Sequence, residues 1–325
     1  MSVLVTGASG HIGGNLVRAL LDQGREIKVV VREDSRAIQG LDVQKINADV
    51  LDYDSLLKAC NGADVIYHLA AKISITGEEG GAVHQVNVIG TRNVVRACLE
   101  SGVKRLIHFS SIHALCCMPP DKPVDESNFL SDGDRALPYD KSKALGEKEV
   151  MAGVNNGLDA VILRPTGVLG PHDYKPSAMG EVFLLLHKRK IPALVEGGFN
   201  WTDVRDVVQG AIAAEQKGRT GEAYILSGTW LSFGDMAVIF EEITGVKTPK
   251  WMTPMWLARL GAPFVTMFNK LIGKRPLYTN CSLDALCWNR QISHAKATKE
   301  LNYSPRPIRE TIVDSVNWFK KAGMI

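Results

Sequence analysis

The chain has 325 residues, of which 45% are hydrophobic and 22% are charged, and its formal net charge is +3. This composition is typical of a globular protein, and the length fits one large α/β domain or a nucleotide-binding domain with a smaller lobe. No block of like charge occurs, which argues against a nucleic-acid-binding protein. The six cysteines form no C-x-x-C pair and do not cluster with histidines at zinc spacing, so we expect no metal site and free thiols in a reducing compartment.

The sequence shows no sign of export or of membrane insertion. Its first residues are typical of a strand and lack the basic and then apolar segment of a secretory signal. No run of about 18 uninterrupted apolar residues occurs, which is the length that a spanning helix needs. We therefore expect a cytoplasmic protein without a membrane-spanning segment.

The first thirteen residues predict a nucleotide-binding turn. The apolar run Ser2–Val5 predicts a buried strand, and the glycine-rich stretch Thr6–Gly13 follows it directly. Apolar residues then recur with a helical period from Ile12 to Leu21, and Gly24 ends the helix. Glycines between a strand and a helix allow a tight turn and a close approach of the backbone to a diphosphate at the helix N-terminus.

The end of the second strand bears on the choice of cofactor. This strand is predicted at Ile27–Val31 and is followed by Arg32. An acid near this position suits the ribose hydroxyls of NAD, whereas an arginine suits the 2′-phosphate of NADP. Arg36 could complete a cationic clamp on that phosphate. We therefore expect NADP, but Glu33 and Asp34 lie beside the arginines, so NAD remains an alternative.

Strands and helices alternate through the rest of the first half. Helices are predicted at 54–60 and 84–99, and strands at 43–47, 65–71 and 106–109. Their short connections predict a parallel, doubly wound sheet of the Rossmann type. Asp49 follows the third strand, where it could bind the adenine amino group. The small residues that end the fourth strand would let a cofactor lie close to the backbone.

A tyrosine and a lysine four residues apart carry the expected chemistry. Tyr139 and Lys143 open a predicted helix and lie on one face of it. A phenol has a pKa near 10, and a neighbouring ammonium group is expected to lower it towards the working range of a proton carrier. The tyrosine could then exchange a proton with a hydroxyl or carbonyl group of a substrate. A serine at the end of the fifth strand, Ser110 or Ser111, could hold the oxygen atom of that group. The alternative is a solvent-exposed Tyr–Lys pair without function.

The second half predicts a smaller α/β lobe over the carboxyl ends of the strands. A sixth strand is predicted at 161–163, and the pattern then loosens into helices at 181–187, 204–216, 233–243 and 310–322 and a strand at 223–226. We expect residues 1–170 to form the dinucleotide-binding domain. Residues 171–325 are expected to form mainly the substrate lobe, with 201–217 returning to the core.

Residues 251–273 are rich in Trp, Met, Leu and Phe and leave three interpretations open. Arg259 and the interruptions at Pro254, Gly261 and Pro263 disfavour a spanning helix. The segment could be a helix pair packed in the core, a lid over an apolar substrate, or an interfacial anchor that contacts a membrane peripherally.

Taken together, these motifs resemble the extended short-chain dehydrogenase/reductase superfamily, also called the NAD-dependent epimerase/dehydratase superfamily. The most specific motifs are T-G-x-x-G-x-x-G at 6–13, Ser-Ser at 110–111 and Y-x-x-x-K at 139–143. Further matching stretches are 49–50, 68–71, 87–91, 163–171, 201–207 and 299–305. The sequence looks closest to the dihydroflavonol-reductase-like and 3β-hydroxysteroid-dehydrogenase-like groups.

The resemblance implies a role for each matching residue. Ser111, in preference to Ser110, would hold the substrate oxygen, Tyr139 would be the acid/base, and Lys143 would tune Tyr139 and bind the nicotinamide ribose. The expected cofactor-binding residues are Thr6, Gly7, Ser9, Gly10, His11, Ile12, Gly13, Arg32, Asp49, Val50, Leu69, Ala70, Ala71, Lys143, Pro165 and Thr166. The last two would lie against the nicotinamide.

Two features near the serine motif leave the substrate open. Relatives often continue this motif with an ending such as V-Y-G, whereas this chain has Ala114-Leu115-Cys116. His113 either contacts the substrate or is a hydrogen-bonded neighbour. The resemblance also implies a homodimer paired through helices near 82–100 and 138–153.

We therefore expect an NAD(P)-dependent oxidoreductase that interconverts a secondary alcohol and a ketone on an apolar or flat small molecule. One alternative is a nucleotide-sugar epimerase or dehydratase with tightly held NAD, which needs cations around a sugar diphosphate. Candidates for those cations are Lys188, Arg189, Arg219, Lys274 and Arg275. A further alternative is a cofactor-sensing protein without activity, although such proteins often lack the tyrosine or the lysine.

Overall fold

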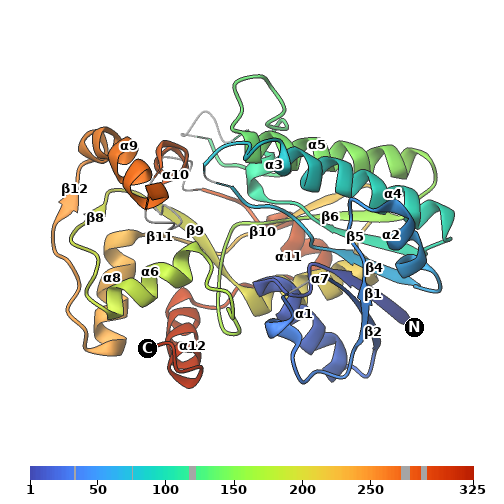
Figure 1. The fold of residues 1–325 in the computed structure, drawn as a ribbon, viewed down its shortest axis with the longest axis horizontal. Coiled ribbons are helices and arrows are strands. Elements are labelled where there is room, and N and C mark those ends of the chain that lie inside the picture. Colours follow the sequence, from blue (N-terminus) through green and yellow to red (C-terminus); the bar gives the residue numbers. More distant parts are fainter. Residues whose placement is uncertain (33, 75, 117–121, 272–278, 287–290) are drawn as a thin grey trace.

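Seven parallel strands form the centre of the computed structural model, which describes the whole chain except residues 33, 75, 117–121, 272–278 and 287–290 (Figure 1). Their order across the sheet is β10-β6-β5-β4-β1-β2-β3. The strands are β1 (Ser2–Thr6), β2 (Glu26–Val31), β3 (Gln44–Asn47), β4 (Val65–His68), β5 (Arg105–Phe109), β6 (Ala160–Pro165) and β10 (Ala223–Leu226). The chain moves outward from β1 to β3 and returns to pair β4 with the other side of β1. Ligands bind at such a reversal in parallel sheets.

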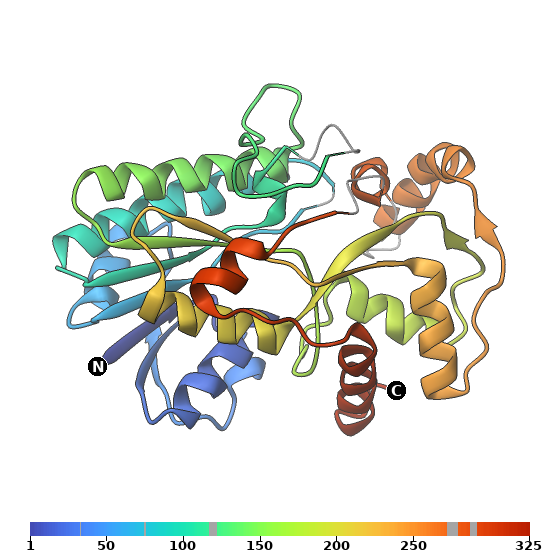
Figure 2. The same ribbon diagram turned by 180° about the vertical axis from the view of Figure 1, so that it is seen from behind.

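Helices cover both faces of this sheet (Figures 1 and 2). Successive residues of β1 show why, because Val5 belongs to the buried cluster under one helical layer and Leu4 to the cluster under the other. The first layer contains α1 (His11–Asp22) and α7 (Val204–Lys217). The second contains α2 (Tyr53–Cys60), α4 (Gly90–Glu100) and α5 (Pro138–Asn155). The predicted doubly wound parallel sheet is confirmed.

The predicted helix at 84–99 is not regular. It is divided into α3 (Ala82–His84), a π-helical turn η2 (Gln85–Ile89) and α4. The wider turn holds Asn87, whose side chain bonds to the backbone of Lys72 rather than to its own helix. Short π-helical segments are frequent at functional sites. Two 3₁₀ turns complete this half, η1 (Arg36–Ile38) and η3 (Ile112–Ala114).

The strand at 223–226 belongs to the central sheet, although the sequence pattern had placed it in the lobe. β10 pairs in parallel with β6, with Tyr224 opposite Leu163. Tyr224, Ile225 and Leu226 are all fully buried. A strand that is apolar on both faces fits a parallel sheet covered by helices, which explains the difference.

The second group of elements lies at the carboxyl ends of the parallel strands, on the left in Figure 1. Two small sheets have the orders β11-β9-β7 and β12-β8. Their strands are β7 (Gly167–Leu169), β8 (Leu194–Val195), β9 (Gly198–Asp203), β11 (Thr229–Ser232) and β12 (Met252–Thr253). The helices of this group are α6 (Ala178–His187), α8 (Phe233–Thr244), α9 (Met255–Leu271), α10 (Asn280–Leu286) and α12 (Ile308–Lys321). By contrast, α11 (Ala295–Leu301) packs on α7 and β10 of the central domain.

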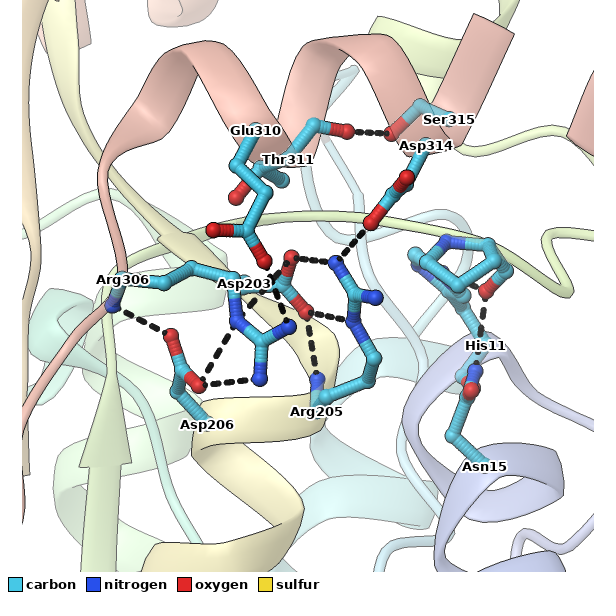
Figure 3. A network of polar contacts seen from close by, with 11 residues as sticks. His11, Asn15, Asp203, Arg205, Asp206, Arg306, Glu310, Thr311, Asp314 and Ser315 are labelled. Carbon is cyan, nitrogen blue, oxygen red and sulfur yellow. Dashed lines mark hydrogen bonds and ion pairs between the residues drawn. The ribbon is translucent and has the colours of Figure 1, made fainter. Parts of the chain in front are cut away.

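A charged network fixes α12 against the start of α7 (Figure 3). Asp203 caps α7 and bonds to Arg205, which also pairs with Asp314 of α12 at 2.7 Å. Arg306, just before α12, pairs with Asp206 at 2.8 Å. Burial alone would raise the pKa of Asp203, but hydrogen bonds from Arg205 lower it more, so the carboxylate stays charged. The C-terminal helix is thus held to the central domain.

The segment 251–271 contains β12 and α9, and most of the large side chains that the structure describes there are not in the core. Trp256, Leu260 and Phe264 are 65%, 63% and 71% exposed. The interpretation of this segment as a core-packed helix pair is therefore wrong for this face of α9. No helix in the described part of the chain combines the length and the hydropathy that crossing a bilayer requires.

Candidate active site

The glycine loop between β1 and α1 packs too closely on the surrounding backbone for side chains at Gly7 and Gly13. Gly7 has a φ of +75°, and a Cβ atom added there would lie 2.6 Å from the backbone nitrogen of Ala70. A Cβ atom at Gly13 would lie 2.2 Å from the carbonyl oxygen of Gly7. α1 begins at His11 after Gly10, and no described side chain caps its amide groups. Uncapped amides and the helix dipole favour an anion at this end.

Thr6 connects this loop to the end of β4. Its backbone oxygen accepts from the amide of Leu69 (3.1 Å), and its hydroxyl oxygen accepts from the amide of Ala70 (3.3 Å). The Thr6 hydroxyl also bonds to Nδ1 of His68 at 2.7 Å. Burial lowers the pKa of His68 to about 3, so this ring is neutral and structural. The predicted residues at 6–13 and at 69–71 therefore lie next to one another.

The loop is also connected to the segment after β7. His11 Nε2 and Asn15 Nδ2 each lie 3.0 Å from the carbonyl oxygen of Pro171 (Figure 3). Ile12 packs against the buried cluster, and Ser9 is half-buried. The ring of His11 thus has a protein partner, so its predicted contribution to cofactor binding falls to its backbone amide.

The two arginines after β2 do not form the predicted clamp in this structure. Arg32 is 69% exposed, and its Nη1 atom lies 3.3 Å from the Asp49 carboxylate. Arg36 turns to Asp34, which accepts bonds of 3.0 and 2.8 Å from it. A hydrogen bond from Arg36 lowers the pKa of Asp34 to about 2, so this pair is fully charged at neutral pH. Val50, which follows Asp49, is buried.

Ser111, Tyr139 and Lys143 lie together where β5 ends and α5 begins. The Ser111 hydroxyl accepts from the amide of His113 at 3.2 Å. It also lies close to the phenol of Tyr139 and lowers the pKa of that group. The hydroxyl of Ser110 is buried and has no partner among the described residues. Lys143 is buried one turn after Tyr139, and its Nζ atom donates to the carbonyl oxygen of Phe109 at 2.8 Å.

The pKa of Tyr139 differs from the expectation. Burial raises it to about 12, although the nearby Ser111 hydroxyl opposes this rise. Burial also lowers the pKa of Lys143 to about 8. The expected lowering of the phenol pKa by Lys143 is not found, because the ammonium group turns to Phe109 and because desolvation disfavours phenolate.

Asn87 positions the start of α5 from behind. Its Nδ2 atom donates to the Ser142 hydroxyl (2.9 Å) and to the carbonyl oxygen of Lys72 (3.0 Å), and its Oδ1 atom accepts from the Lys72 amide (2.7 Å). Ser142 in turn donates to the carbonyl oxygen of Tyr139 at 2.7 Å. One buried amide thus joins the loop after β4 to the tyrosine helix.

Pro165 and Thr166 end β6, on the side of the site away from the glycine loop. Thr166 is buried, and its hydroxyl donates to Oδ1 of Asn200 at 3.1 Å. Oδ1 of Asn200 also accepts from the amide of Gly228 at 2.8 Å. These contacts fix the strand end at which the nicotinamide was expected to lie.

A cavity of about 180 Å³ opens beside Tyr139. Side chains from elements far apart in the sequence line it, and most are apolar. They include Ile73, Met179, Phe199, Trp201, Phe233 and Leu286. No lysine or arginine of the described residues lines it. An apolar wall with several aromatic side chains next to a proton carrier suits a lipophilic substrate.

His113 and Asp140 are the polar pair of this cavity, and Asp140 was missed by the sequence analysis. Nδ1 of His113 lies 2.8 Å from Oδ1 of Asp140, which is 5% exposed. The ring of His113 meets that of Tyr139 edge-on, with centroids 5.3 Å apart. The pair holds the imidazole beside the phenol. The position of Asp140 directly after the tyrosine was the available signal.

The cations considered for a sugar diphosphate do not meet at this cavity. Arg219 pairs with Glu300 at 2.8 Å, where α11 lies beside β10. Lys188 and Arg189 are exposed at the end of α6. Lys274 and Arg275 lie outside the described residues.

The geometry fits a dinucleotide. The tightly packed loop that contains Gly7 and Gly13 lies at the reversal of the sheet, and α1 begins there without a side-chain cap. Ser111 follows β5, which neighbours β4 in the same sheet, and Tyr139 and Lys143 lie at the start of α5.

Comparisons with known proteins agree with this geometry. Sterol demethylase protein B of Methylococcus capsulatus is 32% identical over 331 residues, which cover 100% of both chains. A Synechocystis protein with the name "Putative dihydroflavonol 4-reductase" is 32% identical over 99% of this chain and 95% of its own length. The 3beta-hydroxysteroid-dehydrogenase/decarboxylase isoform 1 of Arabidopsis thaliana is 28% identical over 97% of this chain and 79% of its own length.

The fold also matches solved structures. The crystal structure of gox2253 has a TM-score of 0.86 with this chain at 32% identity, and the match covers 100% of this chain and 99% of that one. The family model described as "NAD dependent epimerase/dehydratase family" matches residues 3–227, from the first strand to the end of β10. The chain therefore belongs to the NAD dependent epimerase/dehydratase family.

Proposed function

We propose that this protein is an NADP-linked oxidoreductase that interconverts a secondary alcohol and a ketone on an apolar small molecule. The observation that carries the proposal is the position of Tyr139. Its phenol lies beside Ser111, which lowers its pKa, and it forms part of the wall of a mostly apolar cavity. A proton carrier and an oxygen-binding hydroxyl are thus available at a site where a carbonyl group could enter.

The dinucleotide would be held by the chain from end to end. The loop 6–13 would bind the diphosphate, Asp49 and Val50 the adenine, and Arg32 the 2′-phosphate. Leu69–Ala71 would lie along the cofactor, and Lys143, Pro165 and Thr166 would meet its nicotinamide end. Hydride transfer is the chemistry that the bound cofactor would supply.

The protein residues would handle the proton and the oxygen. Ser111 would hold the substrate oxygen, and Tyr139 would give or take its proton. Lys143 has a pKa of about 8 and is therefore mostly protonated at neutral pH. It would supply a positive charge near this oxygen without needing to leave its bond to Phe109.

Two observations support an apolar substrate over a sugar nucleotide. The described wall of the cavity contains no cation for a sugar diphosphate, whereas three aromatic side chains, Phe199, Trp201 and Phe233, meet in it. Names of relatives refer to sterol and hydroxysteroid chemistry. An epimerase would hold NAD tightly and regenerate it in each cycle.

Cofactor turnover tests the proposal. With a steroid or long-chain ketone, the purified protein is expected to oxidise NADPH and to form one equivalent of alcohol per NADPH. Epimerisation of a nucleotide sugar without net consumption of the cofactor would refute the reductase and support the epimerase.

We also propose a homodimer that pairs α4 and α5 with their copies. Arg92 and Glu149 tie these two helices together by a 2.7 Å ion pair, so they would meet a partner as one surface. Light scattering is expected to give twice the mass of the chain, and a monomer at micromolar concentration would refute this pairing.

A further inference from the structure

One segment holds more than half of the large hydrophobic residues that are exposed in the described part of the chain. Thirteen large hydrophobic residues are exposed in the described chain, and seven of them lie between 251 and 267. Trp251, Trp256, Phe264 and Met267 are each at least 60% exposed. Scattered exposed apolar residues are normal, but a contiguous group of this kind marks an interaction surface.

These residues form one face of α9. Trp256, Leu260, Phe264 and Met267 are spaced by four, four and three residues, so they share one side of the helix. The other side is buried by smaller contacts, since Ala262 is 2% exposed and Met255 and Ala258 pack on the cluster that contains Leu283 and Leu286 of α10. α9 is therefore seated on α10 by one face and presents its larger apolar face outward.

The part of the sequence around α9 contains basic residues but no acidic ones. Residues 245–283 contain six of the 38 Lys and Arg residues of the chain and none of its 35 Asp and Glu residues. The rest of the chain thus has 32 bases against 35 acids. Lys247, Lys250 and Arg259 are 79%, 69% and 50% exposed, and the acids that they meet, Glu241 and Asp284, lie just outside the segment. These three bases exceed the two acids by one charge, and Lys270, Lys274 and Arg275 add three further bases in the sequence, so the net charge of the region is positive.

We propose that the outer face of α9 docks on the surface of a lipid bilayer that contains anionic lipids. The helix would lie in the plane of the interface, with Trp256, Leu260 and Phe264 among the acyl chains and the surrounding lysines and arginines at the headgroups. Tryptophan suits this depth because its ring is amphipathic.

The place of α9 in the fold relates this surface to the cavity. α9 packs on α10, and Cys281, Ala285 and Leu286 of α10 form part of the cavity wall. Figures 1 and 2 both show α9 and α10 side by side at the end of the molecule opposite the N-terminus. If the proposed function holds, a substrate dissolved in the membrane would reach the cavity along α10 without crossing water. This last step rests on the proposed function, whereas the docking surface does not.

Sedimentation with vesicles tests the docking surface. The purified full chain is expected to bind vesicles of phosphatidylcholine and phosphatidylglycerol in equal parts, and to bind pure phosphatidylcholine more weakly. Added salt should weaken the first binding, because it screens the headgroup charge. The double variant Trp256→Ser, Phe264→Ser should lower the partition coefficient by about tenfold or more, because two large apolar side chains are removed.

A matched control distinguishes this effect from nonspecific adsorption through any exposed apolar side chain. Phe129 is 88% exposed and lies outside the segment, so Phe129→Ser should bind vesicles like the unchanged protein. No binding to the mixed vesicles, or an equal loss in both variants, would overturn the proposal. A concentration-dependent dimer that disappears in the double variant would also overturn it, because a second copy of the chain would then cover the face.

Activity distinguishes this proposal from the proposed function. The double variant is expected to reduce a water-soluble ketone at the rate of the unchanged protein but to lose at least about tenfold on a ketone embedded in vesicles. If neither ketone is reduced by the unchanged protein while vesicle binding is intact, the reductase proposal fails and the docking surface stands. Equal rates of both proteins on the embedded ketone would refute entry from the membrane.

Discussion

The two ends of the candidate site are built from different parts of the chain. The cofactor end consists of backbone, in which glycine residues let the loop after β1 pack on the end of β4 and leave the amides of α1 uncapped for an anion. The substrate end consists of side chains, in which Phe199, Trp201 and Phe233 close an apolar cavity. Backbone geometry is fixed by short local sequence, whereas a cavity wall assembled from distant segments can change residue by residue. This division lets one cofactor site serve many substrates.

Tyr139 lies where the two ends meet, and its removal should separate them most clearly. Tyr139→Phe is expected to lower kcat by about 10²–10⁴-fold, which is the range for loss of a general acid or base. The dissociation constant of NADPH should change little, because the phenol ring remains. Stopped-flow turnover and cofactor titration measure the two effects. Full activity in this variant would remove Tyr139 from the proposed chemistry.

Two glycines test whether backbone space matters at one end and not at the other. Gly13→Ala would place its Cβ atom 2.2 Å from the carbonyl oxygen of Gly7, and we expect a loss of about 1–3 kcal/mol in stability together with a loss of cofactor binding. Gly261→Ala in α9 would meet nothing within 4 Å and should be neutral or slightly stabilising. Thermal unfolding with and without NADPH measures both. Unchanged cofactor affinity in Gly13→Ala would contradict the role of the loop.

Lys143 gives a pH-dependent test of the buried charge between the two ends. Its pKa is about 8 in the folded chain and 10.5 ordinarily, so the unfolded chain binds more protons between these values and stability rises with pH there. Below pH 8 the penalty for the buried ammonium is complete. Lys143→Met should therefore stabilise the protein by about 1–3 kcal/mol at pH 7, less what the bond to Phe109 contributes.

Urea unfolding of both proteins from pH 7 to pH 10.5 measures this difference. The advantage of the variant should shrink as the pH rises from 8 to 10.5, while its activity is lost throughout. A constant difference across this range would mean that the charge of Lys143 costs nothing in the folded state.

The difference between the two ends also decides what sequence can predict. The glycine loop, the alternation of strands and helices and the Tyr–Lys spacing each depend on residues within a few positions, and the structure has these elements where the pattern placed them. The direction of the Tyr139 pKa shift depends on burial by distant segments, so local spacing gave the opposite sign. The sequence pattern assigned the strand at 223–226 to the substrate lobe, because its partner in the central sheet, β6, lies some sixty residues earlier.

The segment 251–273 shows what a hydrophobic pattern cannot predict. Its apolar period is that of a helix, and the structure has a helix there, but the larger apolar face is turned to solvent. The helical period of apolar residues shows that a helix has an apolar face, but it does not show what covers that face. The covering depends on whether another helix or strand packs there. Here α10 covers only the side with Ala258 and Ala262.

At the substrate end, truncation of one residue of the cavity wall should leave the affinity for the cofactor unchanged. Phe233 packs edge-on against Phe199 and Trp201, with centroids 6.2 and 6.3 Å apart. Phe233→Ala is expected to raise KM for an apolar ketone by about tenfold, because apolar contact with the substrate is lost. The dissociation constant of NADPH should stay the same. A parallel loss of cofactor binding would show that the two ends are not independent.

The smallest expected effect lies at the adenine end of the cofactor. There, side chains and not the backbone would determine the preference for NADPH over NADH. Arg32 is exposed and paired with Asp49, so Arg32→Ala should weaken NADPH binding by no more than about tenfold and NADH binding much less. Arg309→Ala is the control, since this arginine is similarly exposed and paired with Glu242 elsewhere in the fold. Isothermal titration with both cofactors measures the ratio. Equal losses for NADPH and NADH would assign Arg32 to the ion pair with Asp49 alone, and the choice of NADP would then need another cation, such as Arg36, the second arginine of the predicted clamp.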